Sequence, residues 1–96
     1  MKNIISQLNK AFESRVRLGI MSILSVNESA DFNTMKQLME VTDGNLASHL
    51  KALEGIGYIE SHKQFIGRKP NTQYTITENG RNRFKEHLNA LEKLLQ

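Results

Sequence analysis

A leucine stripe bounded by helix signals constrains the fold of this 96-residue chain more than any other feature. Leu46, Leu50 and Leu53 are spaced by four and three residues, which places them on one face of a helix. Thr42 is positioned to cap the start of that helix, and Gly55 is positioned to stop it. The segment therefore predicts a short helix that is anchored on one side and leaves the other side free.

Apolar residues at helical spacing predict four further helices, over residues 4–12, 15–26, 34–40 and 78–95. Asp31 and Asn33 are both candidate caps for the helix at 34–40, whose expected buried side is Met35, Leu38 and Met39. Thr77 is the expected cap of the last helix.

Two segments rich in Thr, Tyr and Ile, residues 58–62 and 73–77, have the character of strands. Between them lies Gly67-Arg68-Lys69-Pro70-Asn71, a cluster of turn-forming residues. This pattern predicts a β-hairpin with a long basic tip, and residues 30–32 add a short extended piece. The whole chain, residues 1–96, is expected to form a single domain that is mainly α with a small β-hairpin (α+β).

The positive charge of the chain is concentrated in that hairpin. The chain has 13 Lys and Arg against 10 Asp and Glu, and Lys63, Arg68 and Lys69 lie between Ser61 and Asn71 without any acid. The other Lys and Arg balance the acids, so the whole excess lies in one short segment. A local basic feature favours an anionic partner, although a solvated surface loop would have the same composition.

Two short helices followed at once by a hairpin can present the second helix to the major groove of DNA. Opposite the leucine stripe, the predicted helix carries Gly44, Ser48, Lys51 and Ala52, with Asn45 to one side and His49 nearer the core. Asn45 can form two hydrogen bonds with adenine, and Ser48 can donate or accept a hydrogen bond. Asn45 could equally cap the start of the helix, and His49 could equally be a half-buried residue that is hydrogen-bonded within the domain.

Further contacts with DNA are expected from three places. Arg68 and Lys69 at the hairpin tip can reach the minor groove, with Lys63 beside them. Thr34 and Lys36, near the start of the helix at 34–40, are candidates for a phosphate, because free N–H groups at helix starts bind anions. Ordinary capping explains that helix start equally well.

The segment Ala47-Ser48-His49-Leu50-Lys51-Ala52-Leu53-Glu54-x-x-Gly57-Tyr58-Ile59-Glu60 resembles the recognition helix of ArsR- and MarR-type winged-helix regulators. Gly67-Arg68-Lys69-Pro70-x-Thr72-x-Tyr74-x-Ile76-Thr77-x-x-Gly80-Arg81 is similar to the wing and last helix of a compact subfamily, and Arg17-Leu18-x-Ile20 resembles its first helix. The resemblance implies a winged helix-turn-helix, with the helix pair at about 33–55, the wing at about 58–77 and a dimerisation helix at about 78–95. It also implies a cytoplasmic transcriptional regulator that dimerises through its terminal helices.

The last helix carries Phe84, Leu88, Leu91 and Leu95 at a four, three, four spacing, which resembles a coiled-coil seam. A terminal helix that extends past the wing has little of the domain left to cover it. We therefore favour a homodimer interface over intramolecular core along this seam, with some of it packing on the N-terminal helix. The N-terminal residues expected to contribute to it are Ile4, Ile5, Leu8 and Phe12.

Other classes of function are disfavoured. The absence of Cys excludes thiolate metal sites, and His49, His62 and His87 are too scattered to indicate a metal site. We expect no metal, no cofactor and no membrane span, and the sequence assigns no small-molecule effector. Ser48 and His49 are adjacent on a helix and diverge by about 100°, so they do not form a catalytic pair, and no enzyme is expected. The alternative to DNA binding is a winged helix that contacts only proteins.

Overall fold

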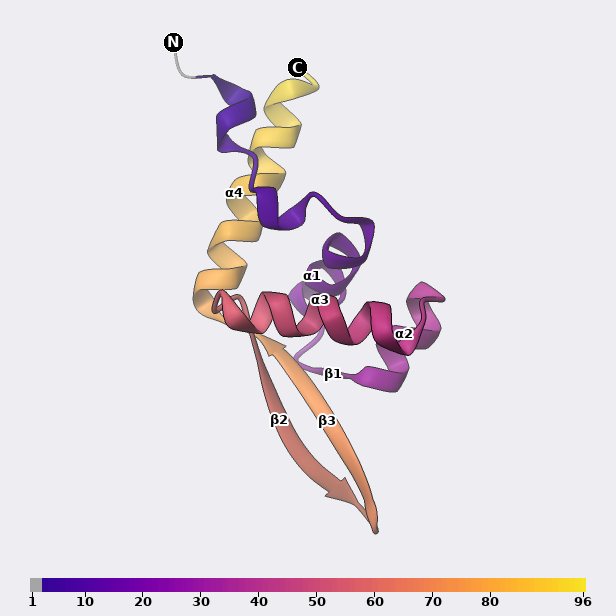
Figure 1. Ribbon diagram of the computed structural model, residues 1–96. Coiled ribbons are helices and arrows are strands. Elements are labelled where there is room, and N and C mark those ends of the chain that lie inside the picture. Colours follow the sequence, from indigo (N-terminus) through magenta and orange to yellow (C-terminus); the bar gives the residue numbers. More distant parts are fainter. Residues whose placement is uncertain (1–2) are drawn as a thin grey trace.

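The computed structural model describes residues 3–96 as three helices packed together, with a hairpin extending from one side and a long helix from the other (Figure 1). Its principal extents are 57 × 25 × 21 Å, so the projecting elements make the domain elongated. The predicted α+β fold class is confirmed. In chain order the elements are η1 (Ile4–Gln7), η2 (Lys10–Phe12), α1 (Arg15–Val26), β1 (Ala30–Asp31), α2 (Phe32–Met39), α3 (Asp43–Gly55), β2 (Ile59–Ile66), β3 (Lys69–Ile76) and α4 (Glu78–Leu94).

The leucine stripe of α3 forms the centre of the core, as predicted. Leu46, Leu50 and Leu53 have at most 1% of their surface exposed. They belong to one cluster with buried residues of α1, α2, β2, η2 and α4: Ile20, Met21, Leu24, Met35, Ile59, Phe12 and Phe84. Burying one Leu side chain contributes about 1.5–3 kcal/mol, so the stripe alone holds α3 firmly to the domain. The predicted burial of Leu38 is wrong, because this residue of α2 is 65% exposed.

Side-chain caps fix where the helices begin. Thr42 accepts a hydrogen bond from the N–H of Asn45, and Thr77 accepts one from the N–H of Gly80, as predicted. Of the two candidates for α2, Asp31 is the cap, since its carboxylate accepts from the N–H of Thr34 at 2.7 Å. The helix therefore begins at Phe32, two residues earlier than predicted.

The end of α3 is set by Gly57, not by Gly55 as predicted. Gly55 is the last helical residue, and Gly57 has a φ of 81°, in the left-handed region. The N–H of Tyr58 donates to the carbonyl of Leu53, and the N–H of Gly57 donates to that of Glu54. These two bonds form a Schellman motif, which turns the chain directly from α3 into β2.

The hairpin is longer and its turn is tighter than predicted. β2 and β3 pair antiparallel over eight residues each, from Ile59↔Ile76 to Ile66↔Lys69, which leaves a two-residue turn. Gly67 has a φ of 66°, which favours glycine at the first position of such a turn. Pro70 fits the ladder because it lies opposite Phe65, one step from the pair that closes the turn, where an antiparallel ladder needs no N–H across the strands.

The short strand β1 ties the hairpin to the helices. The sheet order is β1-β3-β2, and Ala30 and Asp31 pair with Tyr74 and Gln73 of β3. The base of the hairpin is thus hydrogen-bonded to the segment between α1 and α2, whereas its tip extends beyond the helices (Figure 1).

The single N-terminal helix predicted for residues 4–12 is wrong. The structure has two short 3₁₀ helices, η1 and η2, separated by extended backbone at Leu8 and Asn9. The side chains of Asn3 and Asn9 accept from the N–H groups of Ile5 and Ala11, so each starts a new turn and prevents one continuous helix.

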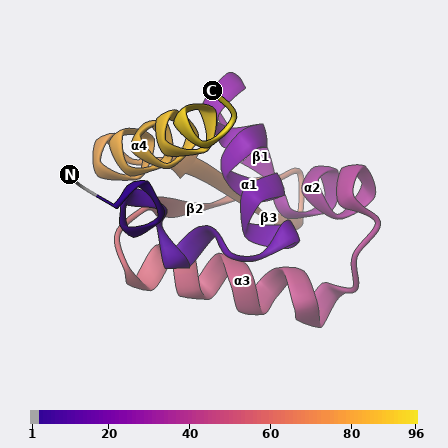
Figure 2. The same ribbon diagram turned by 90° about the horizontal axis from the view of Figure 1, so that it is seen from above.

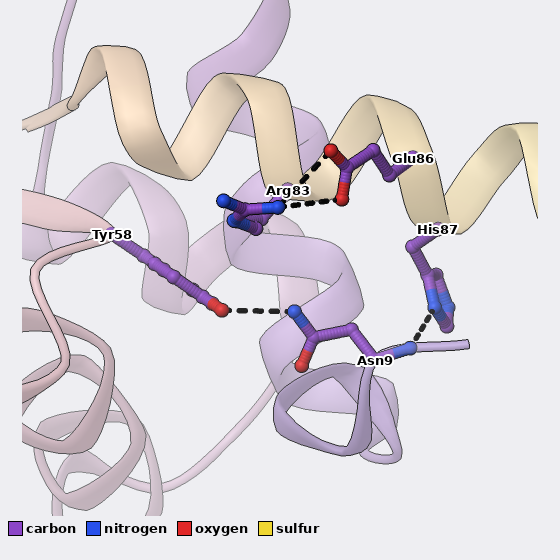
Figure 3. Close-up of polar contacts among 5 residues, drawn as sticks. All are labelled: Asn9, Tyr58, Arg83, Glu86 and His87. Atoms are coloured by element: carbon purple, nitrogen blue, oxygen red, sulfur yellow. Dashed lines mark hydrogen bonds and ion pairs between the residues drawn. The ribbon is translucent and has the colours of Figure 1, made fainter. Parts of the chain in front are cut away.

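Asn9 also fastens this segment to two distant elements (Figure 3). Its backbone N–H donates to Nδ1 of His87 on α4 at 2.9 Å, and its side-chain amide donates to the hydroxyl of Tyr58 at 2.9 Å. The ring of Phe12 packs against Tyr58, Phe84 and His87, with centroids 5.2–5.5 Å apart. The terminal segment, α4 and the corner between α3 and β2 therefore meet at one junction.

His87 is buried in this junction and accepts a hydrogen bond at Nδ1, so the junction requires its neutral form. Burial lowers the pKa of His87 from its ordinary value of 6.5, and the negative charge of Glu13 partly opposes this shift. In the unfolded chain the imidazole binds its proton at a higher pH than in the folded chain.

We therefore predict that the free energy of unfolding decreases as the pH falls below about 6.5, and that His87→Asn makes this decrease smaller. The Asn amide oxygen can accept from Asn9 but does not titrate. Urea unfolding of the two proteins at several pH values between 5 and 8 measures the difference. Equal pH profiles would show that His87 does not contribute.

Candidate nucleic-acid interface

The free face of α3 is open along the helix. Gly44, Asn45, Ser48 and Lys51 are all exposed, while the leucine stripe is buried behind them. Seen from above, α3 lies along one edge of the domain (Figure 2). Ala52, which the sequence also places on this face, is half-buried. The exposed side chains are small or polar, so a partner surface can approach the helix backbone closely.

Lys36 of α2 and Asp43 of α3 form an ion pair at 2.7 Å across the turn between the two helices. Both side chains are substantially exposed, at 41% and 71%. An exposed pair of this kind contributes at most about 1 kcal/mol. Lys36 is thus held at the helix pair by an interaction weak enough to be exchanged for one with a phosphate.

The start of α2 is occupied by a carboxylate. Asp31 accepts from Thr34, and hydrogen bonds from the Thr34 side chain and backbone lower the pKa of Asp31. A negative group at the first turn would repel a phosphate there. The start of α2 is therefore capped by Asp31, as the second of the two interpretations expected. The predicted role of Thr34 in binding phosphate is not supported.

His49 is half-buried, and its Nδ1 accepts a hydrogen bond from Nε of Arg17 on α1 at 3.0 Å. Arg17 also donates to the carbonyl of Ala11. His49 therefore helps to join α3 to α1, and contact of its ring with DNA stays a prediction. No local pattern indicates this role of Arg17, because the two residues are 32 positions apart.

Three side-chain hydrogen bonds hold the hairpin and the residues at its base in place. Ser61 of β2 donates to the Glu54 carboxylate of α3 at 2.7 Å, and Thr77 donates to the carbonyl of Gly57. Asn71 of β3 donates to Asp31 beside the helix pair. Burial, and to a smaller degree the charge of Glu54, raise the pKa of Tyr74, which lies opposite Ser61. The hairpin thus keeps a defined direction relative to α3.

The register places the three hairpin cations around its outer part. Lys63 is on the same face as Ser61, Lys69 is on the other face, and Arg68 is in the turn. All three are exposed. Figures 1 and 2 show α3 along the outside of the helical body and the hairpin projecting from that body, with its base at the end of α3. Sequence reasoning missed two further exposed residues there, Phe65 and Ile66.

The apolar seam of α4 is divided between the core and the surface. Phe84 is 5% exposed, and Phe12, which was expected to join it in the dimer interface, is 1% exposed. These two predictions are wrong, because both rings are packed inside one chain. Beyond them α4 continues alongside η1, where Ala90 is fully buried. The exposed apolar residues of this part are Leu88, Leu91, Leu94, Leu95 and, from η1, Ile5. Ile4 and Leu8 are half-buried.

Among residues 3–96, no group of three or more His, Asp or Glu residues is arranged to hold a metal ion. None of the helices in this part of the chain is long and apolar enough to cross a membrane.

A helix pair whose second helix has a free polar face, followed by a hairpin, defines a winged helix-turn-helix protein. The chain matches the family model of the winged helix DNA-binding domain over residues 16–95, and it belongs to that family. The family predicted from the sequence is thereby confirmed.

Known relatives extend over nearly the whole chain. An uncharacterized protein of Methanocaldococcus jannaschii is 39% identical over 85 residues, which are 88% of this chain and 92% of the relative. The structure of a transcriptional regulator homologue from Pyrococcus horikoshii is similar with a TM-score of 0.77 and 30% identity, over 94% of both chains. Reduced AbfR bound to DNA shares the fold alone, with a TM-score of 0.77 and 17% identity, over 94% of this chain and 64% of AbfR.

Proposed function

We propose that this protein is a sequence-specific regulator of transcription that binds duplex DNA as a homodimer. In this proposal α3 lies in the major groove, where Asn45 and Ser48 contact bases and Lys51 contacts a phosphate or a guanine. The hairpin is the wing, and Arg68 reaches the adjacent minor groove while Lys63 and Lys69 contact the backbone.

The observation that carries this proposal is the fixed arrangement of α3 and the wing. The free face of α3 is polar, and the net positive charge of the chain is in the hairpin that is bonded to its end through Ser61 and Glu54. α3 has 13 residues, and a helix is about 10–12 Å across with its side chains, which fits a major groove about 12 Å wide. The Pyrococcus relative, described as a transcriptional regulator homologue, supports the same class of function.

The homodimer rests on the exposed leucines of α4. Leu88, Leu91 and Leu95 lie within about 60° of one another around the helix, so they form a single exposed stripe. A two-fold pairing of these stripes would bury them and would set two copies of α3 about 34–36 Å apart, one turn of DNA. The alternative function, a winged helix that contacts only proteins, has no comparable use for the cations of the hairpin.

Arg68→Ala is expected to weaken binding to every duplex by about five- to tenfold at low salt, because one charge-assisted contact is lost. The slope of log K against log salt concentration should become shallower by about 0.9. A fluorescence anisotropy titration on mixed-sequence DNA measures both quantities. Arg83→Ala serves as the control, because it also removes one positive charge, but from α4 and not from the wing. An unchanged slope for Arg68→Ala would exclude the assigned role of the wing.

Ser48→Ala and Asn45→Ala are expected to change which base is preferred at single positions of the site, by about 1–3 kcal/mol of discrimination. In vitro selection of duplex DNA with each variant reports the preference. Ser22→Ala, an exposed serine of α1, should select the same site as the unchanged protein. If all variants select one identical site, these side chains do not read bases.

Replacing Leu88 and Leu95 together by Glu is expected to convert the dimer into a monomer, because four carboxylates would then face one another. Both leucines are 45% or more exposed, so the fold of the single chain should be retained. Sedimentation velocity measures the oligomeric state, and affinity for a palindromic site should fall on the order of 100-fold. Asn82→Glu on the opposite side of α4 is the control. A monomeric unchanged protein would show that the dimer proposal is wrong.

A further inference from the structure

The tip of the wing carries two large apolar side chains in water. Phe65 is 74% exposed and Ile66 is 61% exposed. They directly precede the Gly67-Arg68 turn, at the point of the hairpin farthest from the core (Figure 1). Exposed apolar residues at a sheet edge favour aggregation, and natural hairpins commonly carry charged or polar residues at such positions. Two adjacent ones at a projecting tip therefore indicate a contact surface.

The ladder places these two side chains on opposite faces of the ribbon. Phe65 shares a face with Lys63 and lies across from Pro70, whereas Ile66 shares the other face with Lys69, its cross-strand partner. The turn between them adds only Arg68, since Gly67 has no side chain. The tip is therefore a narrow cationic end with one apolar side chain on each flank.

The charge of the tip selects its partner. No acid lies between Ser61 and Asn71, where Lys63, Arg68 and Lys69 are found, so the surface around Phe65 and Ile66 is suited to a polyanion. DNA offers apolar surface next to its charge, because the minor groove is lined by the C–H groups of the two deoxyribose strands. That groove is about 6 Å wide, which admits the two-residue turn but not the full ribbon.

We propose that Phe65 and Ile66 pack against the sugars on the two walls of the minor groove while Arg68 enters between them. This inference rests on the proposed DNA binding and adds a contact of a different physical kind. Phosphate contacts release counterions and weaken steeply with salt, whereas burial of apolar surface does not. The wing then supplies a part of the affinity that persists at high salt.

The test uses the full-length protein and a duplex obtained by in vitro selection. Replacing Phe65 and Ile66 together by Ser is expected to reduce affinity about tenfold at every salt concentration, with the slope of log K against log salt unchanged. Arg68→Ala should instead change the slope. Gln64→Ser, at an exposed polar residue of the same strand, is the control and should bind as the unchanged protein does.

Phe65→Leu, which keeps the apolar contact, should restore most of the affinity lost with Phe65→Ser. Because the side chains at the tip are exposed, thermal unfolding should show the same stability for all variants. If the double Ser variant binds normally while Arg68→Ala alters the slope, the sugar contact is wrong and the proposed function stands. If neither substitution has an effect, both are wrong. A loss confined to low salt, or a change in oligomeric state by sedimentation, would also overturn the sugar contact.

Discussion

Packing of the α3 leucine stripe against α1 and β2 is the interaction on which the rest of the molecule depends. Leu46, Leu50 and Leu53 form the buried face of α3, and the exposed residues of the opposite face are not part of the core. That face can then carry residues chosen for a partner rather than for stability. Gly57 determines where α3 ends, because its left-handed backbone allows the Schellman motif that directs the chain into the wing.

The wing is useful only because its base is fixed. A two-stranded ribbon is marginally stable by itself in water. Here β1 pairs with β3 on one side, and Ser61 is bonded to Glu54 on the other. Gly80 contributes by its lack of a side chain, since a Cβ there would overlap the carbonyl of Tyr58, where the hairpin and α4 meet. The positions of Arg68 and Lys69 are therefore determined by contacts that lie more than about 10 Å further down the ribbon.

Local signals in the sequence were sufficient for the helices that begin at clear caps. Thr42 and Thr77 defined two helix starts correctly, and the leucine spacing defined the core face of α3. Some errors arose from local signals that were misjudged, such as the caps at Asn3 and Asn9 and the turn at Gly57. The others share one cause, which is that the deciding partner is distant in the chain. Periodicity could not show that Phe12 meets Phe84, or that Arg17 bonds His49. At the hairpin, counting turn-forming residues overestimated the loop, because the register that admits Pro70 is visible only once both strands are paired.

The junction around Asn9 connects the two surfaces that the proposed function requires. One bond of Asn9 goes to His87, within the helix whose later turns carry the exposed leucines, and the other goes to Tyr58, which starts the wing. Phe12 packs between the same two residues. Because closely packed interiors transmit displacement rather than absorb it, the angle of α4 and the direction of the wing are set by shared contacts. In a two-fold dimer built on α4, the spacing of the two wings would follow from the same contacts.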